Sequence, residues 1–318
     1  MIPYKKFRNI AKATEEEWLN LRREGIGGSD APAIMGFSKW SSPTSIYLSK
    51  VEPPAVVNSD ENERLYFGHV MEDVVAQEFA KRNPGFKPMK SSFMYQSKEH
   101  PFMLANIDRL IKGKNIGLEC KNVDGRKADE WEGEEGIPLM YQIQCYHYMK
   151  VMGFEGMFIA AIVGGNHYVQ HYLPRNDIAE ENMALIVEAE KRFWEDHVVP
   201  RVPPDPSTLP DLKALYPQDT GNLVEATAED LLIASQLFSI SEQMKSLDAQ
   251  KEELIAKLAV KLKDNSGIMG VCSFKSRAGS ISYKKLAEDL LGKDKIAEVK
   301  DKYIGPSTRT FKNLWKPE

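Results

Sequence analysis

Residues 102–121 read FMLANIDRLIKGKNIGLECK, and this stretch decides the fold. The turn-forming residues KGKN at 112–115 separate two apolar runs, a pattern that predicts a β-hairpin. Glu119 and Lys121 are two residues apart in the second strand, so their side chains lie on the same face. Asp108 lies near the end of the first strand, and pairing of the two strands would bring it to that face as well.

Carboxylates held this close together repel each other unless a cation lies between them. Hard oxygen ligands suit Mg²⁺ or Mn²⁺. Such an ion polarises a phosphodiester, stabilises charge on the leaving oxygen and lowers the pKa of a bound water. Lys121 would orient or deprotonate that water, or offset the charge that builds on the phosphate. A hairpin with solvated charged residues gives the same sequence pattern. Residues elsewhere in the chain are therefore needed to distinguish a metal site from such a hairpin.

The composition is that of an ordinary globular protein. The chain has 318 residues, of which 42% are hydrophobic and 28% charged, and its net charge is −4. Net charge does not exclude a nucleic-acid binder, because phosphate affinity depends on where the basic residues lie. Cys120, Cys145 and Cys272 have no CxxC spacing, which argues against a disulfide framework and structural zinc. We find no signal peptide and no membrane-length apolar run, so we expect a cytoplasmic protein without membrane contact.

The chain around the hairpin alternates between helical and strand patterns, which indicates an α/β core. Thr14 and Glu17 have the spacing of a capping box at the start of the first helix. The apolar residues of a later helix, among them Leu65, Val70, Val74 and Phe79, make it amphipathic. The sequence predicts helices at 14–25, 63–83, 138–153 and 179–199, and further strands at 93–96, 157–165 and 167–174.

A proline-rich segment, RVPPDPSTLPDL at 201–212, is the best candidate for a domain boundary. We therefore expect a core domain at 1–204 and a C-terminal helical and basic extension at 205–318. The extension begins with a helical stretch from Thr227 to about Asn265, either one helix or a broken pair, with apolar spacing that is irregular for a strict heptad.

A basic tail follows that helical stretch. Residues 273–317 contain eleven Lys or Arg against five Asp or Glu, with aromatic residues between them. This stretch is either a surface that follows a phosphate backbone or the solvated face of a small strand-rich unit with one helix.

Three further residues extend the motif of the hairpin. Glu72 lies on the helix predicted before it, and Gln144 and Tyr148 share a face of the helix predicted after it. The resulting order is Glu on a helix, Asp on a strand, Glu-x-Lys on a strand and Gln-x-x-x-Tyr on a helix. It resembles that of the lambda-exonuclease family, or YqaJ-like viral recombinases, within the PD-(D/E)xK nuclease superfamily. Ile107 stands where the superfamily motif has proline.

The resemblance extends towards the N-terminus and covers roughly residues 14–200. In that family, a Trp and an Arg four residues apart precede a small-residue turn that ends in Ser. Here these are Trp18 and Arg22, followed by GIGGSD with Ser29. The resemblance implies that Arg22 and Ser29 hold the 5′-phosphate of a DNA end, a role that helix N-terminal amides also favour.

The resemblance also implies a metal centre. Asp108, Glu119 and the backbone carbonyl of Cys120 would be ligands, and Glu72 would bind a second ion directly or through water. One or two Mg²⁺ ions are expected, and Mn²⁺ would substitute for them. Lys121 would position the attacking water.

Other residues would contact the substrate. Gln144 would touch the substrate phosphate or the active-site water, with Tyr148 beside it. Asn106 replaces a serine found in lambda exonuclease, which changes the phosphate pocket but removes no ligand.

The expected fold is α/β: a PD-(D/E)xK restriction-endonuclease-like core with a central mixed sheet flanked by helices, plus the C-terminal extension. The family implies 5′→3′ digestion of one strand at the ends of linear double-stranded DNA, which leaves 3′ overhangs for a single-strand annealing protein. It further implies a homo-oligomer, commonly a trimeric ring, encoded by a phage or prophage and acting in the cytoplasm of a bacterial host.

Two alternatives belong to other classes of function. A structure-specific or restriction-like endonuclease of the same superfamily would have no use for an end-phosphate pocket built from Arg22 and Ser29. A non-catalytic DNA-binding recombination protein would gain nothing from Glu72, Asp108 and Glu119 facing phosphates.

Overall fold

The computed structural model describes residues 2–53, 63–133, 136–276, 279, 282–299 and 302. The chain divides into two compact units, Met1–Leu215 and Tyr216–Glu318. This division lies after the predicted boundary at 204/205, because helix α7 (Leu209–Leu215) belongs to the first unit. Asp211 of α7 is buried and accepts a 2.5 Å hydrogen bond from the Ser42 hydroxyl.

The first unit contains a five-stranded mixed sheet in the order β3-β6-β7-β8-β9. Strands β7 and β8 are parallel, and the other neighbours are antiparallel. The KGKN turn, in which Gly113 has φ +73°, joins β6 to β7 and confirms the predicted hairpin. The strands are β3 (Pro88–Met89), β6 (Arg109–Ile111), β7 (Ile116–Val123), β8 (Gly156–Val163) and β9 (His167–Pro174).

A second sheet of the same unit has four strands in the order β1-β4-β5-β2. The prediction of one strand over 102–111 is wrong, because the chain passes from this sheet to the other one within that run. Residues 106–108 lie at the crossing, so Asp108 immediately precedes β6 instead of ending a strand. The strands are β1 (Tyr4–Asn9), β2 (Ile26–Gly27), β4 (Phe93–Ser97) and β5 (Met103–Ala105).

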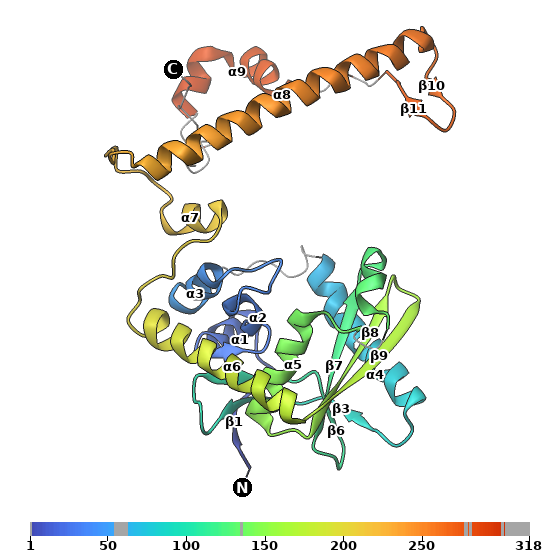
Figure 1. Ribbon diagram of the computed structural model, residues 1–318, viewed down its shortest axis with the longest axis vertical. Helices are drawn as coiled ribbons and strands as arrows, with labels where there is room; N and C mark the ends of the chain where they lie inside the picture. Colours follow the sequence, from blue (N-terminus) through green and yellow to red (C-terminus); the bar gives the residue numbers. More distant parts are fainter. Residues whose placement is uncertain are drawn as a thin grey trace. The chain divides into compact units, whose positions relative to one another are not determined.

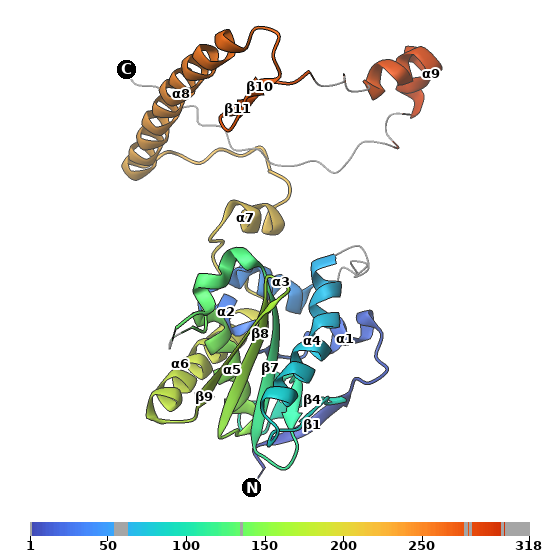
Figure 2. The ribbon, with the colours of Figure 1, turned by 90° about the vertical axis from the view of Figure 1, so that its right-hand side faces the viewer.

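Helices cover both faces of the five-stranded sheet (Figures 1 and 2). Helix α4 packs on one face against β7 and β8, and α5 packs on the other, with α6 against α5. The predicted α/β class, a central mixed sheet flanked by helices, is therefore confirmed. The helices are α1 (Glu15–Arg22), α2 (Ala31–Ile34), α3 (Pro43–Val51), α4 (Glu63–Arg82), α5 (Leu139–Met152) and α6 (Asp177–Phe193).

The apolar face of α4 differs from the predicted one. Leu65, Val70 and Val74 are exposed, whereas Phe79 is fully buried together with Val75. The predicted residues do not form one stripe along the helix. Contact with β7 and β8 buries the side of the helix that carries Val75 and Phe79, four residues apart.

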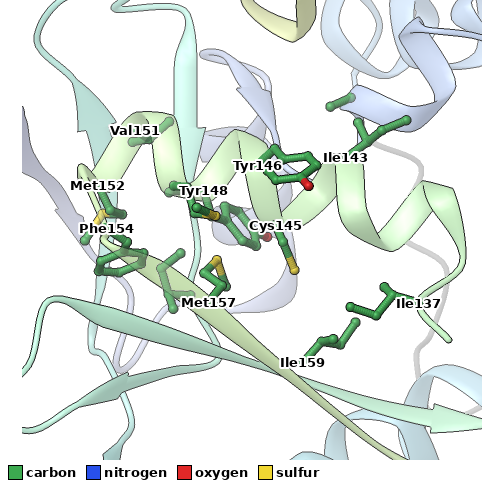
Figure 3. Close-up of a cluster of buried hydrophobic side chains, with 14 of the residues drawn as sticks. Ile137, Ile143, Cys145, Tyr146, Tyr148, Val151, Met152, Phe154, Met157 and Ile159 are labelled. Carbon is green, nitrogen blue, oxygen red and sulfur yellow. The ribbon is translucent and has the colours of Figure 1, made fainter. Parts of the chain in front are cut away.

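The largest part of the core lies between α5 and β8. Figure 3 shows α5 side chains, among them Cys145, Tyr148 and Met152, gathered with Met157 and Ile159 of β8. Helix α5 ends where predicted, because Gly153 adopts the left-handed conformation at φ +66°. This packing fixes the register of α5 above the sheet and so determines which of its side chains face β7.

The second unit begins with α8 (Ala228–Leu262), which is one continuous helix (Figure 1). The Thr227 and Asp230 side chains form a capping box at its start. A two-stranded sheet, β10 (Gly267–Ile268) with β11 (Cys272–Ser273), and α9 (Tyr283–Val299) follow. Parts of the basic stretch at 273–317, including residues 303–317, lie outside the described residues. None of the helices in the described ranges combines the length and apolar character that a membrane span needs.

Candidate active site

Asp108 lies where the chain leaves one sheet for the other. Its Oδ2 accepts a 2.8 Å hydrogen bond from the backbone N–H of Cys120 on β7. The Asp108 side chain thus accepts the hydrogen bond that a backbone carbonyl would accept if β6 were longer. Burial raises the pKa of the Asp108 carboxyl above its ordinary value.

Glu119 is almost completely buried on β7, with 2% of its surface exposed. Its Oε1 accepts hydrogen bonds from Lys121 Nζ at 2.5 Å and from Gln144 Nε2 at 2.7 Å. Its Oε2 is buried and has no hydrogen-bond partner among the residues that the structure describes. Burial, and then the charge of Asp108, raise the pKa of Glu119 to about 8. An unsatisfied carboxylate oxygen of this kind is where a cation would be bound.

Lys121 lies on the same face of β7 as Glu119, as the strand period predicts. Burial lowers the pKa of its ammonium group, but the charges of Glu119 and Asp108 raise it more, so the net shift is upward. The ammonium group also lies 5.0 Å from the ring centre of Tyr141. The carboxylates around it suit the Lys121 ammonium group to orienting a water or offsetting charge on a phosphate.

Glu72 reaches the site from α4. Burial, and then the charge of Asp108, raise its pKa to about 7.

Arg109 is buried beside Glu72, and its guanidinium lies 3.8 Å from Glu72 Oε2. It forms a close ion pair with Asp73 and donates a 2.6 Å hydrogen bond to the Asp108 carbonyl. Sequence reasoning missed Arg109, although an arginine beside the motif aspartate was a signal that could have been followed.

The second predicted group surrounds Arg22. Its guanidinium donates a 2.9 Å hydrogen bond to Ser29 Oγ and lies 5.0 Å from the ring centre of Trp18. It also forms a 2.5 Å ion pair with Asp30. The structure therefore brings Trp18, Arg22 and Ser29 together as the sequence predicts, with an acidic residue added.

Asp30 and Lys50 form a buried ion pair behind this group, which sequence reasoning missed. Lys50 Nζ lies 2.7 Å from Asp30 Oδ2 and donates to the Arg22 carbonyl at 2.9 Å. Burial raises the pKa of Asp30, but Arg22 and Lys50 lower it more, so the net pKa is well below the ordinary range. Asp30 stands at the N-cap position of α2 without capping it, because its carboxylate serves these cations and the Gly27 N–H.

One pocket of about 150 Å³ joins both groups. Gln144 donates to the Tyr148 hydroxyl at 3.3 Å in its wall, and a Cβ on Gly28 would lie 2.6 Å from the Tyr148 ring. The predicted site residues Glu72, Asp108, Glu119, Gln144, Arg22, Ser29, Asn106 and Tyr148 all line this pocket, together with Trp18, Gly27, Gly28, His69, Met94 and Leu104. Lys121 reaches the site through its contact with Glu119.

His147 lies one residue from Tyr148 but points into the protein. It is fully buried, and its ring nitrogens lie 2.6 Å from Glu190 Oε1 and 2.8 Å from the Leu104 carbonyl. Because Leu104 lies in β5, the strand that leads into the crossing with Asp108, His147 helps to hold that crossing in place and points away from the pocket.

The donor set fits a hard divalent cation. The charge of Asp108 raises the pKa of both Glu72 and Glu119, the charge of Glu72 also raises that of Glu119, and Glu119 Oε2 has no hydrogen-bond partner among the described residues. Within the described ranges, no three His, Cys, Asp or Glu side chains already converge as a complete metal cage. Mg²⁺ does not need one, because it keeps several waters and takes one or two carboxylates. The backbone carbonyl of Cys120 would complete the predicted ligand set.

The sequence is similar to that of one known protein family. The family model for the YqaJ-like viral recombinase domain matches residues 17–155. "Uncharacterized protein YqaJ" of Bacillus subtilis (strain 168) is 36% identical over 270 residues, which cover 82% of this chain and 83% of that protein.

Two solved structures share part of the architecture. The alkaline exonuclease LHK-Exo from Laribacter hongkongensis is 15% identical with a TM-score of 0.44, over 57% of this chain and 94% of that one. A phage related exonuclease from Haemophilus somnus 129PT is 12% identical with a TM-score of 0.39, over 56% of this chain and 97% of that one.

Proposed function

The chain belongs to the YqaJ-like viral recombinase family, and from that premise we propose that it is a magnesium-dependent exonuclease that digests one strand of linear duplex DNA from its 5′ end. One observation carries the proposal: a single pocket joins the cationic group of Arg22 and Ser29 to the carboxylates of Glu72, Asp108 and Glu119. Family membership and this site together support a nuclease role.

The cationic side of the pocket would receive the terminal phosphate. Arg22 supplies a charged planar donor, and Ser29 supplies a hydroxyl 2.9 Å from it. Trp18, which lies against Arg22, would restrict the rotation of the guanidinium. A strand end held here would have its first phosphodiester near Asp108 and Glu119, which line the same pocket.

The carboxylate side would carry out hydrolysis. A bound Mg²⁺ supplies a Lewis acid and lowers the pKa of a water. Asp108, Glu119 and the Cys120 carbonyl would hold the ion, and Glu72 would bind a second ion directly or through water. Lys121, which donates to Glu119, would orient the attacking water or offset charge on the phosphate. Gln144 holds Glu119 Oε1 and would contact the substrate phosphate.

The products and partners follow from the family resemblance and are part of the proposal. Resection from the 5′ end leaves 3′ single-stranded overhangs, which a single-strand annealing protein would use in phage-type recombination. The nuclease would act as a homo-oligomer, as a trimeric ring around DNA.

The decisive assay compares three duplex DNAs in the presence of Mg²⁺ or EDTA: linear with a 5′-phosphate, linear with a 5′-hydroxyl, and closed circular. We expect digestion of the linear molecules only, faster with the phosphate, and none in EDTA. Strand-specific end labels would report the 5′→3′ direction. Cleavage of the circle would favour the endonuclease alternative.

Glu119→Gln tests the site itself. This change keeps the side-chain shape but removes the charge beside Asp108, so we expect digestion to fall by at least about a thousandfold. Glu188→Gln, the same substitution on an exposed position of α6, is the matched control and should digest normally. Full activity of a folded Glu119→Gln protein would show that these residues are not the active site.

A further inference from the structure

Helix α8 carries a row of apolar side chains with seven-residue spacing. Its 35 residues form one uninterrupted helix (Figure 1). From Ile233 to Leu258, the positions advance by alternating steps of four and three residues: Ile233, Leu237, Ile240, Met244, Leu247, Lys251, Leu254 and Leu258. This is the a/d pattern of a coiled coil with one polar interruption, Lys251. The apparent irregularity in the sequence came from Lys251 and from apolar residues outside the row.

The row is open to solvent. Its apolar members from Ile233 to Leu254 are between 36% and 62% exposed. A helix of this length is about 52 Å long, so the row is far longer than a single small-molecule groove. Leu232 and Val260 are also exposed but lie off the row, at equivalent c positions. A continuous exposed a/d row is the surface that another helix of the same period covers.

The row is complementary to itself when the partner runs antiparallel. Turning a second copy end for end about the middle of α8, between Lys245 and Ser246, aligns every a position with a d position. The resulting layers pair Ile233 with Leu258, Leu237 with Leu254, Ile240 with Lys251, and Met244 with Leu247. Each layer occurs twice, and the two helices overlap along their whole length.

Charge selects the same arrangement. In a parallel pair, Lys251 would face Lys251 of the partner across the seam, which is unfavourable. In the antiparallel pair, each Lys251 faces Ile240, and its long side chain can extend to the solvent. The flanking positions pair Gln236 with Lys257, Gln243 with Gln250, and Ser241 with Asp248, without like charges.

We propose that α8 forms an antiparallel two-stranded coiled coil with α8 of a second copy of this chain. The contact belongs to the second unit and does not depend on the nuclease activity. It would join two copies of the chain through their second units.

Site-specific cross-linking tests the direction of the pairing. Full-length Leu237→Cys and Leu254→Cys chains, each in a Cys272→Ser background and with tags of different size, are co-expressed and mildly oxidised. Free thiols are then blocked before denaturation, which protects against artefacts from the buried Cys120 and Cys145. We expect a disulfide between the two different chains and none when either variant is present alone.

Two outcomes would overturn the proposal. Cross-linking of Leu237→Cys to itself would indicate a parallel pair. The absence of a mixed product would mean that α8 does not pair in this register, for instance because another part of the same chain covers it.

A matched pair of substitutions tests the face. Leu247→Glu places a charge in the seam, whereas Ala249→Glu places the same charge on the opposite side of the helix. In the two-cysteine system we expect Leu247→Glu to reduce the mixed product at least tenfold and Ala249→Glu to leave it unchanged, with equal helicity by circular dichroism. Equal yields for the two variants would reject the seam. Because the measurement is a cross-link, the test of the coiled coil does not depend on whether the protein digests DNA.

Discussion

At the scale of single residues, Asp30 is the charge around which the Arg22 side of the pocket is arranged. Two cations, Arg22 and Lys50, lie within 2.7 Å of its carboxylate, and the Lys50 side chain is only 2% exposed. The three side chains together carry a net charge of +1. Because Lys50 neutralises Asp30 from behind, the positive charge of Arg22 remains available to an incoming phosphate.

We therefore expect Lys50→Met to weaken recognition of the terminal phosphate. Without Lys50, Asp30 is balanced by Arg22 alone and the net charge of the group falls to zero. The ratio of digestion rates for 5′-phosphorylated and 5′-hydroxyl ends should drop by about tenfold. Lys39→Met, which removes an exposed lysine paired with Glu130, is the control. An unchanged ratio in a folded Lys50→Met protein would contradict this role of Lys50.

The same cluster predicts a pH dependence of stability. The pKa of Asp30 is held below its ordinary value of about 4. A carboxyl with a lowered folded-state pKa stabilises the fold above its unfolded-state pKa, and that contribution is lost as the pH falls towards the folded-state pKa.

Asp30→Asn should lower the free energy of unfolding by roughly 3–5 kcal/mol at pH 7, because it leaves buried Lys50 without its partner. The gap between the two proteins should narrow as the pH drops below about 4. Urea titrations at several pH values measure it, and a gap that stays constant down to pH 3 would be inconsistent with Asp30 as the source.

At the scale of elements, the break between β5 and β6 produces the candidate active site. The hairpin of β6 and β7 could be predicted from sequence, because a turn motif and strand periodicity are local signals. The break could not be predicted, because residues 102–111 form one mostly apolar run. Its division arises only because β5 pairs in the four-stranded sheet and β6 in the five-stranded sheet. That break frees Asp108 to bond the Cys120 N–H with its side chain.

The residues of the site that sequence reasoning missed share one property. Arg109 and Lys50 find their partners far along the chain, in Asp73 of α4 and in Asp30. The partners are not separated by the short intervals that bring side chains together on one helix or one strand, so the sequence alone does not reveal these pairs. Arg22, Ser29, Glu119 and Gln144 could be predicted because they belong to a recognisable order of motifs.

The close contact between the GIGG turn and α5 gives a prediction for Gly28. A methyl group there would lie 2.6 Å from the buried ring of Tyr148. Gly28→Ala should therefore displace Tyr148, destabilise the protein by about 1–3 kcal/mol and slow digestion. Gly85→Ala, at a position with nothing within 4 Å, is the control and should melt and digest normally. Thermal melts and the linear-DNA assay measure both effects, and a Gly28→Ala protein that matches the control would show that the contact is dispensable.

At the scale of the whole molecule, the two units should separate after Leu215 and not before α7. Asp211 of α7 bonds Ser42, and Leu215 packs against the apolar cluster of α3. We expect fragment 1–215 to unfold in one cooperative transition. Fragment 1–204 should melt a few degrees Celsius lower, because it loses these contacts. Equal melting temperatures would mean that α7 contributes nothing to the first unit.

The size of the shared pocket limits how a DNA end can enter it. A volume of about 150 Å³ corresponds to roughly five water molecules of the bulk liquid. That is room for a phosphate and a few ordered waters. Under the proposed function, we therefore expect the terminal phosphate to occupy the pocket while the bases stay outside it. The enzyme should be indifferent to base sequence, and damage confined to a base should slow it less than a modified phosphate.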